Sequence, residues 1–266
     1  MSHVRLPLIT LTTDFGADSP YVAQMKGVIY TRLADCRIVD VTHSIAPQSI
    51  WEAAFLLPTS VPFFPPGTVH VVVVDPGVGT ERNILCVRSS SQYLIGPDNG
   101  LFSMFFDKPD CHVRRLEDRS FWRSEVSDTF HGRDIMAPVA AALAADANQF
   151  EKIGSTVPLD HVVRIEFPSV VIEGNVIQGQ IAYVDSFGNL ISNLSRQQVE
   201  SVLAKPDLCI RFGKQVIHGI TRTYGDAADG SVVALLGSSG YLEIAVVGGN
   251  AATALSAGAG TVVRLE

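Results

Sequence analysis

The chain has 266 residues, enough for one large domain or for two domains of ordinary size. Hydrophobic residues make up 47% and charged residues 18%, so a sizeable core can form, and the net charge of −7 argues against a nucleic-acid partner, which needs a basic surface. The sequence has no apolar run near the roughly 20 residues of a membrane-spanning helix and no apolar signal segment in residues 1–7, so we expect no membrane partner.

The first 160 or so residues alternate strand and helix signals. A short apolar run is followed by Ser19 and Pro20, a favourable cap and first residue of a helix, and Ser49 with Glu52 has the spacing of a capping box. The continuous apolar run 69–74 is typical of a strand buried on both faces. We therefore predict a parallel α/β domain over residues 1–160, with strands at 8–12, 37–42, 69–74, 84–87 and 93–95, and a helix at 135–145.

The composition changes near residues 158–168, and strand signals dominate from there. We predict a smaller, mainly β domain over residues 169–266, with one short helix near 196–203. The Gly/Ala-rich tract 248–260 fits a loop or close small-residue packing equally well. The expected strands are 170–172, 176–184, 208–212, 232–236, 242–246 and 261–265.

The four cysteines are far apart in sequence and include no CxxC pair: they are Cys36, Cys86, Cys111 and Cys209. Such spacing offers no chelating pair for zinc, so we expect no metal site. We interpret the four as reduced thiols of a cytoplasmic protein.

Polar clusters follow two of the predicted strands, where open α/β sheets bind ligands. Asp14 comes after the first strand; its carboxylate can accept hydrogen bonds from a ribose diol or can cap a turn. Asp75 follows the run 69–74, and Arg82 is close enough to pair with it or to orient a nucleophile. The glycines between them do not complete the GxGxxG pattern, so the loop is a poor dinucleotide fingerprint.

Three more clusters remain open between a binding role and a structural one. His131, just before a helix, can polarise water, hold an anion or cap the helix. The run 185–189 joins a carboxylate, an aromatic ring and an amide, which suits either ligand binding or a hairpin turn. Residues 237–244 offer hydroxyls and backbone N–H groups for a carboxylate, or form a Gly-rich turn.

Read in order, these clusters resemble the S-adenosyl-L-methionine (SAM) hydroxide adenosyltransferases, the SAM hydrolase relatives of the fluorinases and chlorinases. The motifs extend over nearly the whole chain. They are TTDFG at Thr12, YVAQMKG at Tyr21, VDVTHSI at Val39, FFPPGTVHVVVVDPGVGT at Phe63, GPDNGL at Gly96, FHGRD at Phe130, VDSFGNLISN at Val184 and SSGYLEIAV at Ser238.

The resemblance implies an N-terminal α/β domain, a C-terminal β-barrel-like domain, and a homotrimer that binds SAM as substrate at its subunit interfaces, with no further cofactor. It implies that Asp14 holds the ribose hydroxyls, while Asn189, Phe187 and backbone near Val246 contact adenine. Asp185 would take the methionine amino group, and Ser238 with Glu243 would hold the amino-acid end.

The family's hydrolases carry an Asp/Arg/His trio around the attacking water, and these positions fall on Asp75, Arg82 and His131. The halogenases have Tyr at the first position and lack the other two. We therefore expect hydrolysis of SAM to adenosine and methionine. The alternatives are a chlorinase on the same scaffold and a non-catalytic adenosine- or SAM-binding module. A nicotinamide-dependent dehydrogenase is disfavoured by the incomplete glycine pattern.

Overall fold

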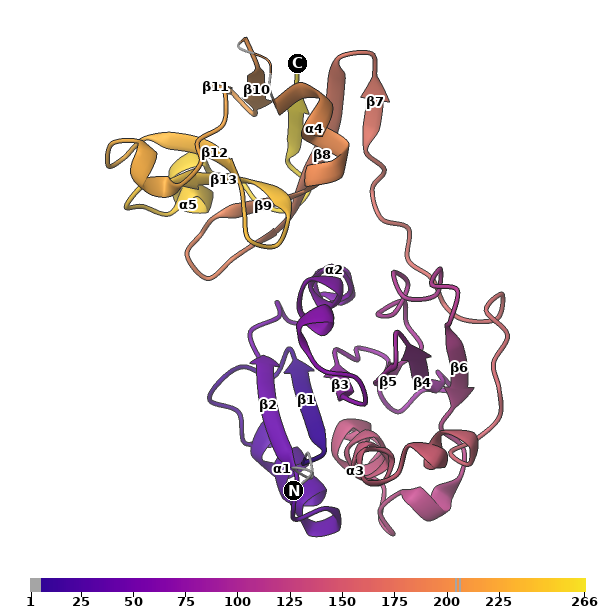
Figure 1. Ribbon diagram of the computed structural model, residues 1–266. Helices are drawn as coiled ribbons and strands as arrows, with labels where there is room; N and C mark the ends of the chain where they lie inside the picture. Colours follow the sequence, from indigo (N-terminus) through magenta and orange to yellow (C-terminus); the bar gives the residue numbers. More distant parts are fainter. Residues whose placement is uncertain (1–5, 204, 206) are drawn as a thin grey trace, which may run out of the picture. The chain divides into compact units, whose positions relative to one another are not determined.

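The computed structural model describes residues 6–203, 205 and 207–266. The chain divides into two compact units, Met1–Ile165 and Glu166–Glu266, and each is described here by itself (Figure 1).

The N-terminal unit is built on a six-stranded sheet of order β2-β1-β3-β5-β4-β6. Strands β1, β2, β3 and β5 are parallel, whereas β4 is antiparallel to both of its neighbours. The elements are β1 (Leu8–Thr13), α1 (Pro20–Arg32), β2 (Arg37–Thr42), α2 (Ile50–Ser60), β3 (Val69–Val73), β4 (Ile84–Ser89), β5 (Gln92–Pro97), β6 (His112–Arg115) and α3 (Ala137–Ala145). The predicted α/β class is confirmed, but the sheet is mixed and β6 was not predicted.

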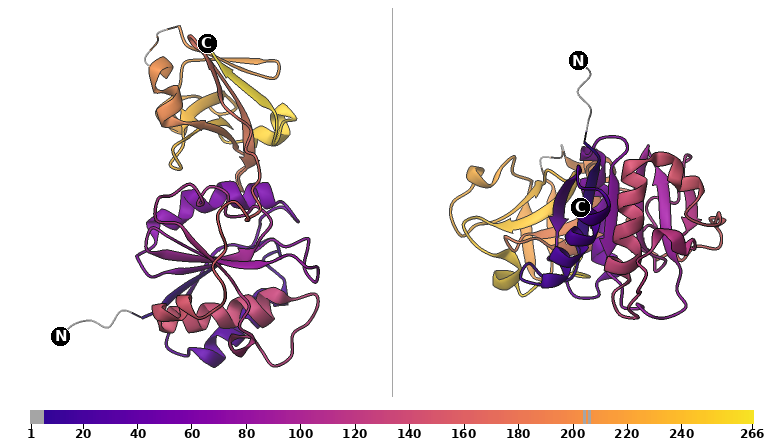
Figure 2. Two further views of the ribbon diagram at one scale, coloured as in Figure 1. Left: turned by 90° about the vertical axis from the view of Figure 1, so that its right-hand side faces the viewer. Right: turned by 90° about the horizontal axis from the view of Figure 1, so that it is seen from below.

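Helices cover both faces of this sheet, which Figure 2 (left) shows edge-on. Helices α1 and α3 pack on one face, with Met25, Ile29 and Val139 in their shared core. Helix α2 and the segment 101–106 pack on the other face, around Leu57 and Phe102. Because both faces are covered, every residue of β3 is buried, as its continuous apolar run predicts.

The helix starts follow the predicted chemistry, with one difference. The Ser19 hydroxyl accepts a hydrogen bond from the Tyr21 N–H at 3.3 Å, and the Ser49 hydroxyl accepts from the Glu52 N–H at 3.4 Å. The Glu52 carboxylate, however, accepts from the Ala46 N–H rather than from the Ser49 N–H. The capping box is therefore only half formed, since the Ser49 N–H is taken by the Ala46 carbonyl.

The C-terminal unit is an antiparallel, barrel-like sheet of order β11-β10-β14-β8-β9-β13-β12, with β7 paired to β8. Beyond β11, the Thr221 N–H donates to the Ala234 carbonyl of β12 at 2.8 Å, which brings the two ends of the sheet together. The elements are β7 (Val171–Glu173), β8 (Val176–Val184), β9 (Leu190–Ser195), α4 (Arg196–Leu203), β10 (Cys209–Phe212), β11 (Gln215–His218), β12 (Val232–Leu236), β13 (Tyr241–Val246), α5 (Ala251–Leu255) and β14 (Val262–Leu265).

Strands β9 and β11 were not predicted, and the Gly/Ala-rich tract contains the short helix α5, which begins at the cap residue Asn250. Short 3₁₀ turns occupy Val61–Phe63, Arg119–Phe121, Ala147–Glu151 and Tyr224–Asp226. All four cysteines are free thiols. None of the helices in the described part of the chain is long and apolar enough to cross a membrane.

Candidate active site

The carboxyl ends of β1 and β3 bring two predicted site residues to one edge of the sheet. Asp14 directly follows β1, and Asp75 lies two residues beyond β3. The two strands pair in parallel with Thr13 opposite Val73, so both aspartates lie at the same end of the sheet, where the strands finish. The strand that follows β1 in the chain, β2, lies on the other side of β1, so the strand order reverses here. Ligand sites of open α/β sheets form at such a switch point.

A cavity of about 600 Å³ opens at this edge and is lined by Asp14, Asp75 and His131. Its aromatic wall is formed by Phe15, Tyr21 and Phe130, whose rings meet edge to face with centroids 5.1–5.7 Å apart. In the sequence these three aromatic residues occur only as members of the motifs TTDFG, YVAQMKG and FHGRD, and none of them was given a role of its own. Their common wall arises from the packing of α1 against the segment before α3, for which the sequence holds no local signal.

Arg82 joins the other two members of the predicted trio. Its Nε donates to Asp75 Oδ1 at 2.7 Å, and its Nη2 donates to Asp75 Oδ2. The same Nη2 lies 3.0 Å from His131 Nδ1. Only 10% of the Arg82 side chain and 5% of the Asp75 side chain are exposed, so solvent screens this fork-shaped ion pair weakly. The pairing of Arg82 with Asp75 that the sequence suggested is therefore present, and it is buried.

The contact with Arg82 fixes the protonation of His131. A guanidinium can only donate hydrogen bonds, so His131 Nδ1 must accept and the ring proton of the neutral imidazole lies on Nε2. Burial and the adjacent Arg82 charge lower the pKa of His131 below its ordinary value, despite the opposing effect of Asp75. Near neutral pH, His131 is thus a neutral ring whose free polar group is a donor.

Two local features hold the loops that carry the trio. Gly79 adopts a φ of +79°, and a side chain there would collide with the Asp128 carbonyl, so only glycine fits this close approach. Asp134 is fully buried and accepts hydrogen bonds from Arg123, Arg133 and the Ser127 N–H. Asp134 therefore ties the loop 123–133 to the π-helical turn that follows His131.

Asp14 is positioned by a backbone contact from the loop before α2. Its Oδ2 accepts the Gln48 N–H at 2.8 Å, and Gln48, which also lines the cavity, has a φ of 65°. The carboxylate keeps further acceptor sites for a ligand hydroxyl.

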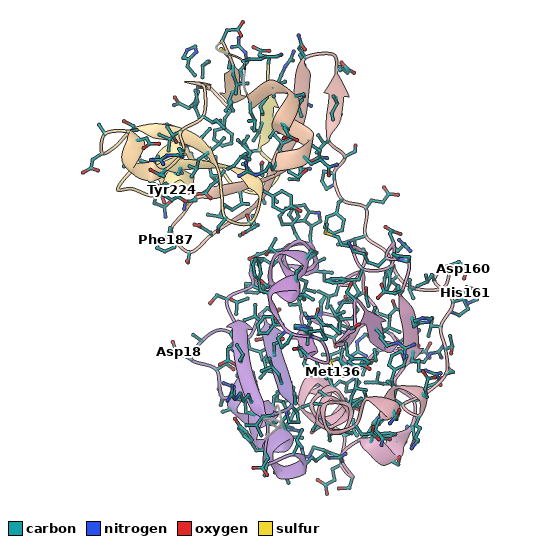
Figure 3. All side chains as sticks on the ribbon, in the orientation of Figure 1. Asp18, Met136, Asp160, His161, Phe187 and Tyr224 are labelled. Atoms are coloured by element: carbon teal, nitrogen blue, oxygen red, sulfur yellow. The ribbon has the colours of Figure 1, made fainter. Side chains whose placement is uncertain are left out.

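In the C-terminal unit, three of the predicted binding residues gather in one groove. Phe187, Asn189 and Val246 line a hollow of about 390 Å³ together with Tyr224. Figure 3 labels Phe187 and Tyr224 at this part of the unit. Phe187 is 76% exposed, whereas Asn189 is buried. Tyr224 was missed because no recognisable motif surrounds it in the sequence. Only the fold of the unit brings it to the groove beside Asn189.

The remaining predicted residues have mainly structural partners. Asp185 accepts hydrogen bonds from the Phe187 N–H at 2.9 Å, the Asn189 N–H at 2.8 Å and Asn189 Nδ2 at 3.0 Å, which is the turn chemistry considered from the sequence. Glu243 is buried, accepts the Tyr224 hydroxyl, and has a pKa raised by burial. Ser238 is exposed in the turn before β13 and does not line the groove.

Comparison with known proteins places this architecture in a family. Residues 9–154 match the SAM hydroxide adenosyltransferase N-terminal domain, and residues 179–264 match the C-terminal domain of the same family. The chain belongs to the SAM hydroxide adenosyltransferase family.

Full-length relatives support this assignment. An (R)-S-adenosyl-L-methionine hydrolase of Thermus thermophilus is 36% identical over 95% of this chain and 97% of its own length. A protein of the same name from Methanocaldococcus jannaschii is 34% identical over 94% of this chain and 92% of its own length. Fluorinases are also similar, at 26–27% identity. An uncharacterised conserved protein of Thermotoga maritima has a similar structure, with a TM-score of 0.89, 32% identity and coverage of 97% of this chain and 99% of its own.

Proposed function

We propose that this protein hydrolyses SAM to adenosine and L-methionine by attack of water on C5′ of the ribose. The observation that carries the proposal is the buried Asp75–Arg82–His131 constellation beside the cavity at the carboxyl ends of β1 and β3. Relatives named (R)-S-adenosyl-L-methionine hydrolase, similar over nearly the whole chain, support the same reaction.

The chemistry asks little of the protein beyond positioning. The sulfonium of SAM leaves C5′ as the neutral thioether of methionine, while the C5′–O bond forms and one water proton is released. No acid has to protonate the leaving group, and we propose that no metal or cofactor takes part. Holding one water in line with the C5′–S bond contributes several kcal/mol, up to about 7–11 kcal/mol in well-aligned intramolecular reactions.

Each member of the trio has a distinct role in this proposal. Asp75 accepts a hydrogen bond from the attacking water through lone pairs that Arg82 leaves free, and receives the proton as attack proceeds. Arg82 bonds to both Asp75 and His131 and so fixes the positions of the two side chains relative to each other. His131 donates its Nε2–H to the water oxygen and stabilises hydroxide character. A relay through His131 requires the contact with Arg82 to break first, because that contact occupies Nδ1.

The substrate contacts remain as the family resemblance implies. We propose that Asp14 binds the ribose hydroxyls, that Phe187, Asn189 and the backbone at Val246 bind adenine, and that Tyr224 forms part of the same wall. Asp185, Ser238 and Glu243 are proposed to hold the methionine end.

We further propose a cytoplasmic homotrimer in which each SAM is bound by two subunits. Free thiols at all four cysteines suit the reducing cytoplasm. Light scattering at several protein concentrations tests the trimer, and a monomer with full activity would contradict it.

The reaction is tested by incubating the protein with SAM and a chelator in chloride-free and chloride-rich buffer, and separating the products by chromatography. We expect adenosine and methionine in equal amounts, independent of chloride. A chlorinated nucleoside would identify a halogenase, and intact SAM bound to the protein would identify a binding module.

A further inference from the structure

A second cavity, of about 560 Å³, lies next to the trio in the N-terminal unit. It is formed by Thr80, by residues 82–84 and by parts of the segment 115–135. His131 lines both this cavity and the one beside Asp14, while Arg82 lines the second cavity and bonds to Asp75, which lines the first. The trio therefore lies between two hollows, and the mechanism above uses only one of them.

The second cavity is strongly basic in a chain whose net charge is −7. A single aspartate, Asp128, lines it together with four arginines, which are Arg82, Arg115, Arg119 and Arg123.

The carboxylates around these arginines do not match them one to one. Arg123 shares Asp134 with Arg133. Among the described residues, the one ion pair of Arg115 is with Glu117, at 3.3 Å between Nη1 and Oε1, and solvent reaches both side chains. Arg119 makes no ion pair within the part of the chain that the structure describes; its guanidinium instead lies 5.4 Å from the centre of the Trp122 ring.

Hydrogen-bond donors are also left over around this cavity. Among the described residues, neither Arg115 Nε nor Trp122 Nε1 has a hydrogen-bond partner, although both atoms are buried. Both side chains line the cavity. Arg82 uses Nε and Nη2 toward Asp75 and His131, and its Nη1 makes no hydrogen bond to another described residue. Buried donors without acceptors are unfavourable, so a ligand rich in acceptor oxygens is the matching chemistry.

We propose that this arginine-lined cavity binds an inorganic oxyanion such as phosphate, and that the bound anion slows hydrolysis by competing with Asp75 for Arg82. The planar fork of a guanidinium matches two oxygens of a tetrahedral oxyanion, and the cavity is roomy enough for the anion with bridging waters. The negative charge of Asp128 opposes anion binding, but four arginines line the same cavity. The inhibitory effect rests on the proposed function of the trio; the binding does not.

The structure predicts the form of the inhibition. Arg115, Arg119 and Trp122 do not line the cavity that contains Asp14, so phosphate and SAM occupy different places. Phosphate should therefore lower kcat and leave KM for SAM unchanged. Because Arg119 has no other ion pair to lose, Arg119→Gln should keep the basal kcat and weaken phosphate binding roughly tenfold, the value of one charge-assisted hydrogen bond.

The experiment has a binding arm and a kinetic arm. Calorimetric titration of the full chain with inorganic phosphate, at constant ionic strength and without SAM, measures binding whether or not SAM is hydrolysed. Arg164→Gln, which removes an exposed arginine from a different ion pair, is the matched control. We expect phosphate binding and kcat inhibition in the wild type and the control, and in Arg119→Gln we expect both to require roughly tenfold more phosphate. If the heat of phosphate titration did not exceed that of titration with sodium chloride, the result would be an adventitious ion effect and would overturn the proposal. Inhibition by phosphate that raised KM for SAM without lowering kcat would also overturn it.

Discussion

Replacing Arg82 by lysine tests whether the geometry of the trio, rather than its charge, supports the reaction. Arg82 makes one hydrogen bond to each Asp75 oxygen and one to His131 Nδ1. A lysine ammonium keeps the charge but is a point donor without the rigid fork, so we expect it to keep one of these contacts. Two charge-assisted hydrogen bonds at about 1.5 kcal/mol each amount to about 3 kcal/mol of positioning free energy. At 1.36 kcal/mol per factor of ten, kcat should fall about 100-fold.

The assay is the initial rate of adenosine formation over a range of SAM concentrations. KM should change little, because Arg82 does not line the cavity with Asp14. Arg164→Lys is the control, since the same substitution there affects an ion pair with Asp107 that is largely exposed. If Arg82→Lys retained kcat within about threefold of the wild type, the proposed positioning by the guanidinium fork would be wrong.

Three further predictions follow from single groups. Because burial and the Arg82 charge lower the pKa of His131 below 6.5, the kcat profile should stay flat down to that pH and decline only in more acid buffer; a decline beginning above pH 7 would contradict this. Removing the exposed ring of Phe187 by Phe187→Ala should raise KM for SAM about tenfold through lost stacking, whereas Phe63→Ala, at another exposed ring, should leave it unchanged. Burial lowers the pKa of His70 from 6.5 to about 4. Between these two pH values the unfolded chain binds more protons than the folded one, so the free energy of unfolding falls as the pH falls. The total loss, reached near pH 4, is about 3 kcal/mol. Urea unfolding at several pH values should show a smaller acid loss for His70→Asn, and an equal loss would refute the assignment.

Local patterns in the sequence were sufficient to predict the strands that carry Asp14 and Asp75 to the first cavity. The apolar run before Asp75 indicated a strand buried on both faces, and β3 is such a strand. Since parallel strands end at the same edge of a sheet, Asp14 and Asp75 could be expected together. The short separation of Arg82 from Asp75 similarly allowed their pairing to be anticipated. His131 is different: it lies 49 residues beyond Arg82, and only the family resemblance predicted its place in the trio.

Other features depend on tertiary packing and leave no local signal. The apolar start of β4 has the pattern of a buried strand, but its reversed direction follows from its tight hairpin with β5, which that pattern does not reveal. The short strand β11 has only Ile217 buried, so it lacks the pattern of a buried strand. The ring tautomer of His131 is set by a neighbour distant in sequence. The arginine-lined cavity joins Thr80 and residues 82–84 to parts of the segment 115–135, which only the folded chain brings together.

The most direct test of the account is hydrolysis of SAM in water enriched in the heavy oxygen isotope, followed by mass spectrometry of both products. Attack of the positioned water on C5′ predicts that the label enters the 5′-hydroxyl of adenosine and that methionine stays unlabelled. Adenosine without label, or label that appears in methionine, would contradict the proposal that the Asp75–Arg82–His131 trio directs water to C5′.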